Sequence, residues 1–95
     1  MPDAATHMRI DLLLCRLRFV KSRSLAHRWV EEGHIRVNGA RVTHDHHCVR
    51  AGDILTLPIG NTVKVIALDS LPDRRGPAAE ARAHYRDLTH GEQSP

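Results

Sequence analysis

The sequence contains few aromatic residues, and this scarcity limits how it can recognise other molecules. Phenylalanine, tyrosine and tryptophan make up 3% of the 95 residues, as Phe19, Trp29 and Tyr85. Trp29 and Tyr85 fall in apolar helical patterns, which assigns their rings to the core. A surface that reads unpaired bases by stacking needs several exposed rings. The sequence therefore argues against sequence-specific reading of single-stranded nucleic acid.

Cysteines and long apolar runs are also scarce. The two cysteines, Cys15 and Cys48, do not have a Cys-x-x-Cys spacing, and Cys15 lies in an apolar helical pattern where a buried thiol is usual. No stretch approaches the ~18 apolar residues of a membrane helix, and residues 1–7 lack the charged start and apolar run of an export signal. We therefore expect a cytoplasmic protein that is neither exported nor inserted in a membrane.

Motifs of catalysis are missing as well. The sequence has no Gly-x-Ser-x-Gly, no phosphate-binding loop and no paired-carboxylate signature. A chain of this length forms one domain with a small core and has little room for a concave substrate pocket. We expect no enzyme and no cofactor.

Acidic residues are absent from one basic stretch. The formal net charge is +3, but residues 1–50 hold nine Lys and Arg against five Asp and Glu, whereas residues 51–95 hold five against six. Between residues 16 and 28 there are five basic residues and no acidic one. Such a segregated positive field attracts polyanions.

Two helices are predicted in the first third of the chain. The first has an apolar stripe at i, i+3, i+4 and i+7, formed by Ile10, Leu13, Leu14 and Leu17. Ser22 is a good N-cap for the second, whose buried face is supplied by Leu25, Ala26, Trp29 and Val30. Gly33 ends this helix, because glycine readily takes the left-handed conformation that a helix C-terminus often needs.

Strands are predicted beyond Gly33. Residues 35–37 and 40–42 form a hairpin around Asn38-Gly39, since a type I′ turn needs two positive φ angles. Residues 43–50 read as a loop, 54–57 as a strand, 58–61 as a turn and 62–68 as a final strand rich in β-branched residues.

The C-terminal third is predicted to add one helix after a linker. Pro77 opens a helix that carries Ala81, Tyr85 and Leu88 at i, i+4 and i+7. We divide the chain into a disordered lead (1–8), a main domain (9–70), a linker and C-terminal helix (71–90) and a frayed tail (91–95). The fold class is α+β.

Phosphate groups are the expected ligands of the basic stretch. The main electrostatic surface consists of Arg16, Arg18, Lys21, Arg23 and Arg28, and Arg9, Arg36 and Arg41 extend it. Further donors to phosphate or sugar are Ser22, Ser24, His27, His34 and Asn38, together with the backbone N–H groups at the start of the second helix. Asn38 serves its turn first, and Asp11 is expected to cap a helix or pair with an arginine. We predict that folded RNA is recognised by its shape and its phosphates.

A family resemblance supports this prediction. Several elements occur in order at the spacing of the RNA-binding domain named after ribosomal protein S4: Arg9-Ile10-Asp11, Leu14, Lys21-Ser22-Arg23-Ser24, Ala26, Gly33, Val37-Asn38-Gly39, Val42, Val49 and Gly52-Asp53-Ile54. The resemblance spans roughly residues 9–57. It implies the alpha-L motif, in which two helices pack on a small twisted antiparallel sheet.

Within that family the sequence resembles small stand-alone bacterial members of the heat shock protein 15 type. Arg18-Phe19 before Lys21, and Asp73-Arg74-Arg75-Gly76-Pro77-Ala78 before a helix with Glu80 and Tyr85, are similar to that subgroup's pattern. The resemblance implies binding to ribosomal RNA of the large ribosomal subunit, and a stress-related role in recycling stalled subunits.

Two alternatives stay open. Phosphate attraction does not distinguish RNA from DNA, so a general module for DNA or tRNA is the nearest competitor. A metal site in residues 44–48 would use His44, His46 and Cys48, but adjacent residues cannot all converge on one tetrahedral ion. We expect no metal.

Overall fold

A computed structural model of the chain describes residues 7–44 and 46–88. In chain order the elements are β1 (Met8–Arg9), α1 (Ile10–Arg16), α2 (Arg23–Glu31), β2 (Ile35–Val37), β3 (Ala40–Val42), β4 (Cys48–Val49), β5 (Ile54–Ile59), β6 (Thr62–Leu68), α3 (Ala78–Arg82) and β7 (Tyr85–Asp87). Five strands form an antiparallel sheet in the order β3-β2-β5-β6-β7, and β1 pairs with β4 in a separate two-stranded sheet.

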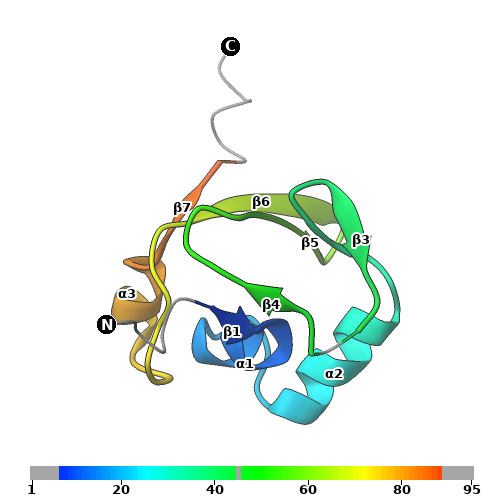
Figure 1. The fold of residues 1–95 in the computed structure, drawn as a ribbon. Coiled ribbons are helices and arrows are strands. Elements are labelled where there is room, and N and C mark those ends of the chain that lie inside the picture. The colour runs from blue at the N-terminus through cyan, green and yellow to red at the C-terminus, as the bar shows by residue number, and fades with distance from the viewer. Residues whose placement is uncertain (1–6, 45, 89–95) are drawn as a thin grey trace.

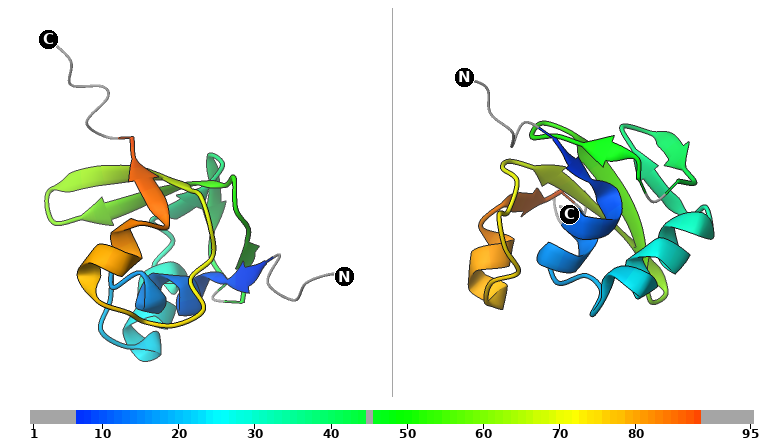
Figure 2. Two further views of the ribbon diagram at one scale, coloured as in Figure 1. Left: turned by 90° about the vertical axis from the view of Figure 1, so that its left-hand side faces the viewer. Right: turned by 60° about the horizontal axis from the view of Figure 1, so that its bottom comes forward.

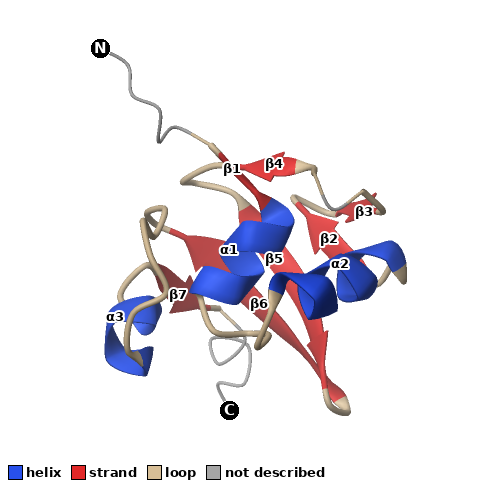
Figure 3. Cartoon of the chain, turned by 90° about the horizontal axis from the view of Figure 1, so that it is seen from below, coloured by secondary structure: helices blue, strands red, loops and turns tan. Residues whose placement is uncertain are grey.

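The helices lie on one side of the five-stranded sheet. Figure 1 shows α1 and α2 beneath it, and Figure 3 shows the two helices side by side across that face. Figure 2 shows α3 on the same side, next to the β7 edge. Among the described residues, no helix covers the opposite face. The predicted α+β architecture of two N-terminal helices on an antiparallel sheet is confirmed.

The core lies between the helices and this face of the sheet. The predicted stripe of α1 is buried throughout, with Ile10 and Leu13 at 0% exposure. Alternate residues of β5 and β6, such as Leu55, Leu57 and Ile66, point into the same core from the sheet. Apolar side chains that recur every 3.6 residues in the helices and every second residue in the strands thus pack into one apolar layer.

Ser22 caps α2 as predicted. Its extended backbone is followed directly by the helix, and its hydroxyl oxygen accepts a hydrogen bond from the backbone N–H of Leu25 at 3.3 Å. The buried face of α2 needs one correction. Ala26 and Val30 are fully buried and Trp29 is half-buried, but Leu25 is 42% exposed because the first turn of α2 extends beyond the core.

The cap gives a prediction for stability. Ser22→Ala lowers the free energy of unfolding by about 1 kcal/mol, because the Leu25 N–H in the first turn loses the hydroxyl acceptor. Ser24→Ala is the matched control, since Ser24 lies within the first turn and its hydroxyl makes no hydrogen bond inside the described residues; it should change the value by less than about 0.5 kcal/mol. Urea denaturation followed by circular dichroism measures both. Equal losses in the two variants would contradict the cap.

The predicted hairpin is confirmed and is attached to β5. Asn38 and Gly39 have φ angles of 53° and 86°, as the turn requires. The Asn38 side chain also donates to Asp53 at 3.1 Å and accepts from the backbone N–H of Ile54 at 2.9 Å. Asn38 therefore serves both its own turn and the start of β5.

Strand β5 is longer than predicted. Residues 58–61 were expected to turn, but β5 continues to Ile59, with Pro58 opposite Val63 on β6. Ile59 and Thr62 flank the two-residue turn, and in an antiparallel hairpin such a pair exchanges two backbone hydrogen bonds. The next pair, Pro58 and Val63, is of the type that exchanges none, so no N–H of residue 58 is needed towards β6. On its other side, β2 pairs only with Leu55 and Thr56. The missing N–H of proline therefore costs no ladder bond.

The prediction of a loop over residues 43–50 is wrong at its end. Cys48 and Val49 form β4, which pairs with Arg9 and Met8 of β1. The backbone N–H of Ile10 also bonds to the carbonyl of His47 at 2.7 Å. This pairing between distant segments gives Met8, assigned to the disordered lead, a place in a strand. The rest of the lead falls on residues outside the described part except His7, and the frayed tail lies wholly outside it.

The predicted C-terminal helix is too long. Pro77 precedes α3 as its N-cap residue, and the helix ends at Arg82. Tyr85 then belongs to β7, which pairs with β6, and the N–H of Leu88 bonds to the carbonyl of Val65 at 2.8 Å. The open edge of β6 offers backbone partners that the helical pattern does not reveal, and the Tyr85 ring packs on Phe19 with centroids 5.5 Å apart.

Candidate nucleic-acid interface

A buried carboxylate organises two of the predicted cations. Asp11, with a side chain only 4% exposed, accepts from Arg9 at 2.9 and 3.2 Å and from Arg23 at 3.3 Å and 3.5 Å. Its Oδ1 also accepts from the backbone N–H of Leu12 at 2.7 Å. The predicted pairing of Asp11 with an arginine is confirmed. Because two guanidinium groups share one carboxylate, the cluster keeps a net positive charge.

This cluster places a carboxylate beside the basic stretch of residues 16–28, which contains no acidic residue of its own. Asp11 lies outside residues 16–28 in sequence but is brought beside Arg23 by the packing of α1 against α2. The field at the start of α2 is therefore weaker than the sequence suggests. Arg9 and Arg23 remain about half exposed, at 45% and 49%, so both can also face a ligand.

Arg16 and Arg18 are tied to the C-terminal part of the chain. Arg16 donates to the carbonyl of Pro72 at 3.0 Å, and Arg18 donates to the carbonyl of Gly76 at 2.9 Å. In the other direction, Arg75 donates to the carbonyl of Cys15 at 3.1 Å. Figure 2 shows residues 69–77 running past α1. Carbonyl oxygens fix these guanidinium groups without neutralising them.

Arg18 stands in an unusual backbone position. Its φ is +68°, and the N–H groups of Arg18 and Phe19 bond to the carbonyls of Cys15 and Leu14. This is the Schellman arrangement that ends a helix, with arginine where glycine is the usual residue. The backbone geometry sends the chain away from α1 at residues 18–22 and places Arg18 beside α3 and its linker.

Lys21 and Arg28 form a third group. Both line a groove between residues 19–21, which connect α1 to α2, and the outer side of α2. Arg18 lines a second hollow that adjoins this groove. Within residues 7–44 and 46–88, neither Lys21 nor Arg28 makes an ion pair. Like Arg16 and Arg18, these two side chains therefore keep their positive charge un-neutralised within the described residues.

The start of α2 adds polar donors beside this group. Ser22 and Ser24 are both exposed, and the first N–H groups of the helix have no partner within it. His27, one turn further, lies 3.2 Å from Glu31. Together with Lys21 and Arg28, the helix start offers an anion both charge and hydrogen-bond donors.

The hairpin cations form a separate group. Arg36 and Arg41 are exposed cross-strand partners on β2 and β3, and Arg36 donates to the carbonyl of Gly39 at 3.3 Å. Like charges in this position repel each other, so an anion bound between them would be favourable. His34 is exposed at the start of the hairpin. The structure thus gathers the other predicted residues around α1 and α2 and leaves His34, Arg36, Asn38 and Arg41 on the neighbouring hairpin.

Some cations near the site were not predicted from sequence. Arg75 lies against the end of α1, and Arg82 lines a hollow with Arg18. Arg75 belongs to the Arg-Arg pair after Asp73, but only the fold places it, and Arg82, beside the basic stretch. Arg74 differs, because its hydrogen bond and ion pair with Glu80 raise its pKa. The carboxylate of Glu80 also neutralises its charge.

The described residues of the His-rich segment, 44 and 46–48, belong to no group of side chains that could hold a metal ion. In the part of the chain that the structure describes, no three His, Cys, Asp or Glu side chains are close enough to hold an ion. The rings of His44 and His46 pack together, with centroids 5.3 Å apart. The thiol of Cys48 donates a hydrogen bond to the carbonyl of His46. Asp45 lies outside the described residues.

None of the helices within the described residues has the length and apolar character needed to span a bilayer.

Comparison with known proteins identifies the family. The model of the S4 domain matches residues 8–55. The chain is 32% identical to heat shock protein 15 of Escherichia coli K12 over 83 residues, which cover 87% of this chain and 62% of that protein. It is 45% identical to small ribosomal subunit protein uS4 of Gloeobacter violaceus over 49 residues, covering 52% of this chain and 24% of that protein. The chain thus spans less than two thirds of these relatives.

A solved structure extends the similarity to most of the chain. The trimeric structure of heat shock protein 15 from Vibrio cholerae superposes with a TM-score of 0.81 at 35% identity, covering 92% of this chain and 91% of that one. Family membership supports RNA binding. The chain therefore belongs to the S4 domain family, as a protein of the heat shock protein 15 type.

Proposed function

We propose that the chain binds structured ribosomal RNA through the surface formed by α1, residues 17–22 and α2. The observation that carries this proposal is the group of un-neutralised cations on an S4 domain. Arg16 and Arg18 are held by carbonyls, and Lys21 and Arg28 make no ion pair within the described residues. Phosphates are the ligands that such a surface attracts, because each contact releases counterions from the nucleic acid.

Recognition of folded RNA follows from the rigidity of this surface. Asp11 fixes Arg9 and Arg23, and the linker carbonyls fix Arg16 and Arg18. Cations held at set positions match phosphates that are themselves held at set positions, as in a folded RNA. Arg36 and Arg41 on the hairpin supply a second contact region.

The finer proposal concerns the ribosome. The similarity to heat shock protein 15 supports an association with the large ribosomal subunit and a stress-related role in recycling stalled subunits. Sedimentation of cell extract through a sucrose gradient tests this directly, and we expect the protein to travel with free large subunits. Exclusive migration with small subunits, or at the top of the gradient, would remove the large subunit from the proposal.

Duplex DNA is the competing ligand because it presents the same phosphates. A competition between a structured ribosomal RNA fragment and a DNA duplex of equal length, at the same salt concentration, distinguishes the two. We expect the RNA to displace the labelled fragment at much lower concentration than the DNA. Equal displacement would indicate a general nucleic-acid-binding module.

A further inference from the structure

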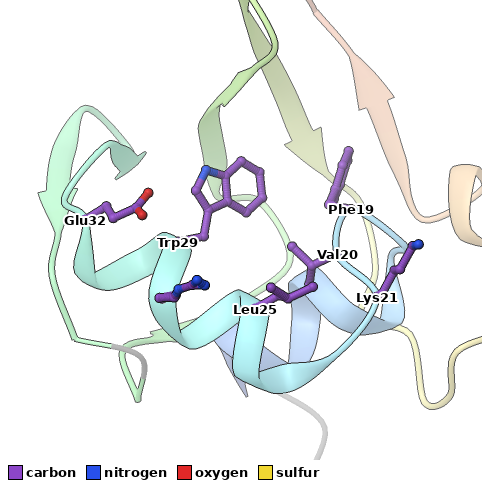
Figure 4. Close-up of a pocket in the computed structure, with 7 residues that line it drawn as sticks. Phe19, Val20, Lys21, Leu25, Trp29 and Glu32 are labelled. Atoms are coloured by element: carbon purple, nitrogen blue, oxygen red, sulfur yellow. The ribbon is translucent and has the colours of Figure 1, made fainter.

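An apolar groove adjoins the un-neutralised cations. It has a volume of about 530 Å³ and an apolar floor made by Phe19, Val20, Leu25 and Trp29. Figure 4 shows these side chains with Lys21 and Glu32 around them. A second hollow of about 400 Å³ shares Phe19, Val20 and Trp29 and reaches the tip of the β5–β6 hairpin. The combined space is within the range of small-ligand sites.

The core uses the apolar residues of this groove only in part, since Phe19, Val20 and Trp29 pack against it but stay partly exposed. Leu25 is 42% exposed, Ile59 at the hairpin tip is 38% exposed, and Trp29 is half-buried. The Phe19 ring already packs on Tyr85. Among the described residues Trp29 has no ring partner, so its indole is the aromatic surface left for a ligand.

The charges around the groove indicate the chemistry of its occupant. Lys21 and Arg28 line it without an ion pair among the described residues, and Arg18 lines the adjoining hollow. Only Glu32, one turn beyond Arg28, is acidic. A flat apolar ligand that carries a negative charge at one side complements this arrangement. A nucleotide has both parts, a base with a π-face and a phosphate.

We propose that the groove receives one unpaired base of the bound RNA, stacked on Trp29, with an adjacent phosphate at Lys21 and Arg28. This inference deepens the proposed RNA-binding function and rests on it. It also revises the sequence-based argument against base stacking, which counted rings and assigned Trp29 to the core. The preferred RNA is then a folded one with a bulged or otherwise unpaired nucleotide beside a helix, and a continuous duplex binds more weakly.

The test uses two RNA hairpins that differ by one bulged nucleotide. The bulge is 2-aminopurine, whose fluorescence reports stacking, and the reference hairpin is fully paired with an equal number of phosphates. We expect about tenfold tighter binding of the bulged RNA and quenching of its fluorescence on binding. Because Trp29 is the only tryptophan, its emission should change in the same titration.

Two variants assign the effect to the groove. Trp29→Leu and Leu25→Ser should both remove the preference for the bulge while keeping the affinity for the paired hairpin. Val63→Ser is the matched control, since Val63 is 51% exposed and does not line the groove; it should keep the preference. Leu25→Ser alters an exposed side chain, so it stays informative even if Trp29→Leu impairs folding.

Three results would overturn the inference. Equal affinity for the two hairpins would remove the unpaired base but leave the RNA-binding function intact. Failure to bind either hairpin would contradict the function as well. A shift of Trp29 emission with protein concentration in the absence of RNA, in step with self-association, would assign the groove to a second copy of the chain.

Discussion

Replacing Lys21 and Arg28 together by alanine should weaken binding to a structured ribosomal RNA fragment by about 25- to 60-fold at 0.1 M salt. Each phosphate contact changes the slope of log affinity against log salt by about 0.7 to 0.9. Two contacts therefore raise the affinity by roughly 1.4 to 1.8 log units when salt falls from 1 M to 0.1 M. These two side chains are chosen because neither makes an ion pair within residues 7–44 and 46–88. Fluorescence anisotropy over a series of salt concentrations measures both the affinity and the slope.

The salt dependence gives this prediction its second observable. If about five phosphates are contacted, the wild-type slope is roughly −3.5 to −4.5, which is a loss of ~10² to 10³ in affinity between 50 and 200 mM salt. The double variant should have a slope that is shallower by about 1.4 to 1.8. A wild-type slope near zero would show that charge does not dominate binding.

A matched double variant separates location from total charge. Lys64→Ala with Arg86→Ala removes the same two charges from β6 and β7, where Lys64 pairs with Asp87 at 2.7 Å and Arg86 pairs with Asp69 at 3.1 Å. We expect its affinity to change by less than about threefold, because long-range attraction between exposed charges is screened. Equal weakening in both variants would mean that only net charge matters, and the proposed surface would be wrong.

The fold was predictable where the determining interactions are local. Three predicted features depend only on residues close together in sequence, and all three are confirmed: the apolar stripe of α1, the Ser22 cap and the Asn38-Gly39 turn. The pairing of β1 with β4 and of β6 with β7 joins residues far apart in sequence. Strand pairing of this kind has no periodic signal, and Tyr85 satisfied a helical pattern although it lies in a strand.

The same distinction applies to the candidate site. The sequence correctly identified a basic stretch and the pairing of Asp11 with an arginine. It missed the contact between Asp11 and Arg23, because their distance depends on how α1 and α2 pack. It also missed the groove, because Leu25 and Trp29 fit a buried helical face equally well. Only the packing decides which apolar residues of an amphipathic helix remain exposed.

The helix pair that carries the site depends on a few buried side chains, and Leu14→Ala should remove much of its stability. Leu14 is 1% exposed in the core. Truncating a buried leucine typically lowers the free energy of unfolding by about 2 to 5 kcal/mol, through lost burial and an unfilled cavity. Since small domains are stable by only about 5 to 15 kcal/mol, this change is a large fraction of the total. Urea denaturation of the RNA-free protein measures it.

Leu12→Ala and added RNA complete this experiment. Leu12 lies on the same helix but is only partly buried, so its truncation should cost clearly less than that of Leu14. RNA that binds only the folded chain adds about 2.7 kcal/mol of stability at a concentration 100 times its dissociation constant. It should therefore raise the melting temperature of Leu14→Ala, and the effect should shrink as salt weakens binding. Stabilisation by RNA that is independent of salt would contradict a charged RNA-binding surface. Similar losses in both leucine variants would contradict the distinct place of Leu14 in the core of this helix pair.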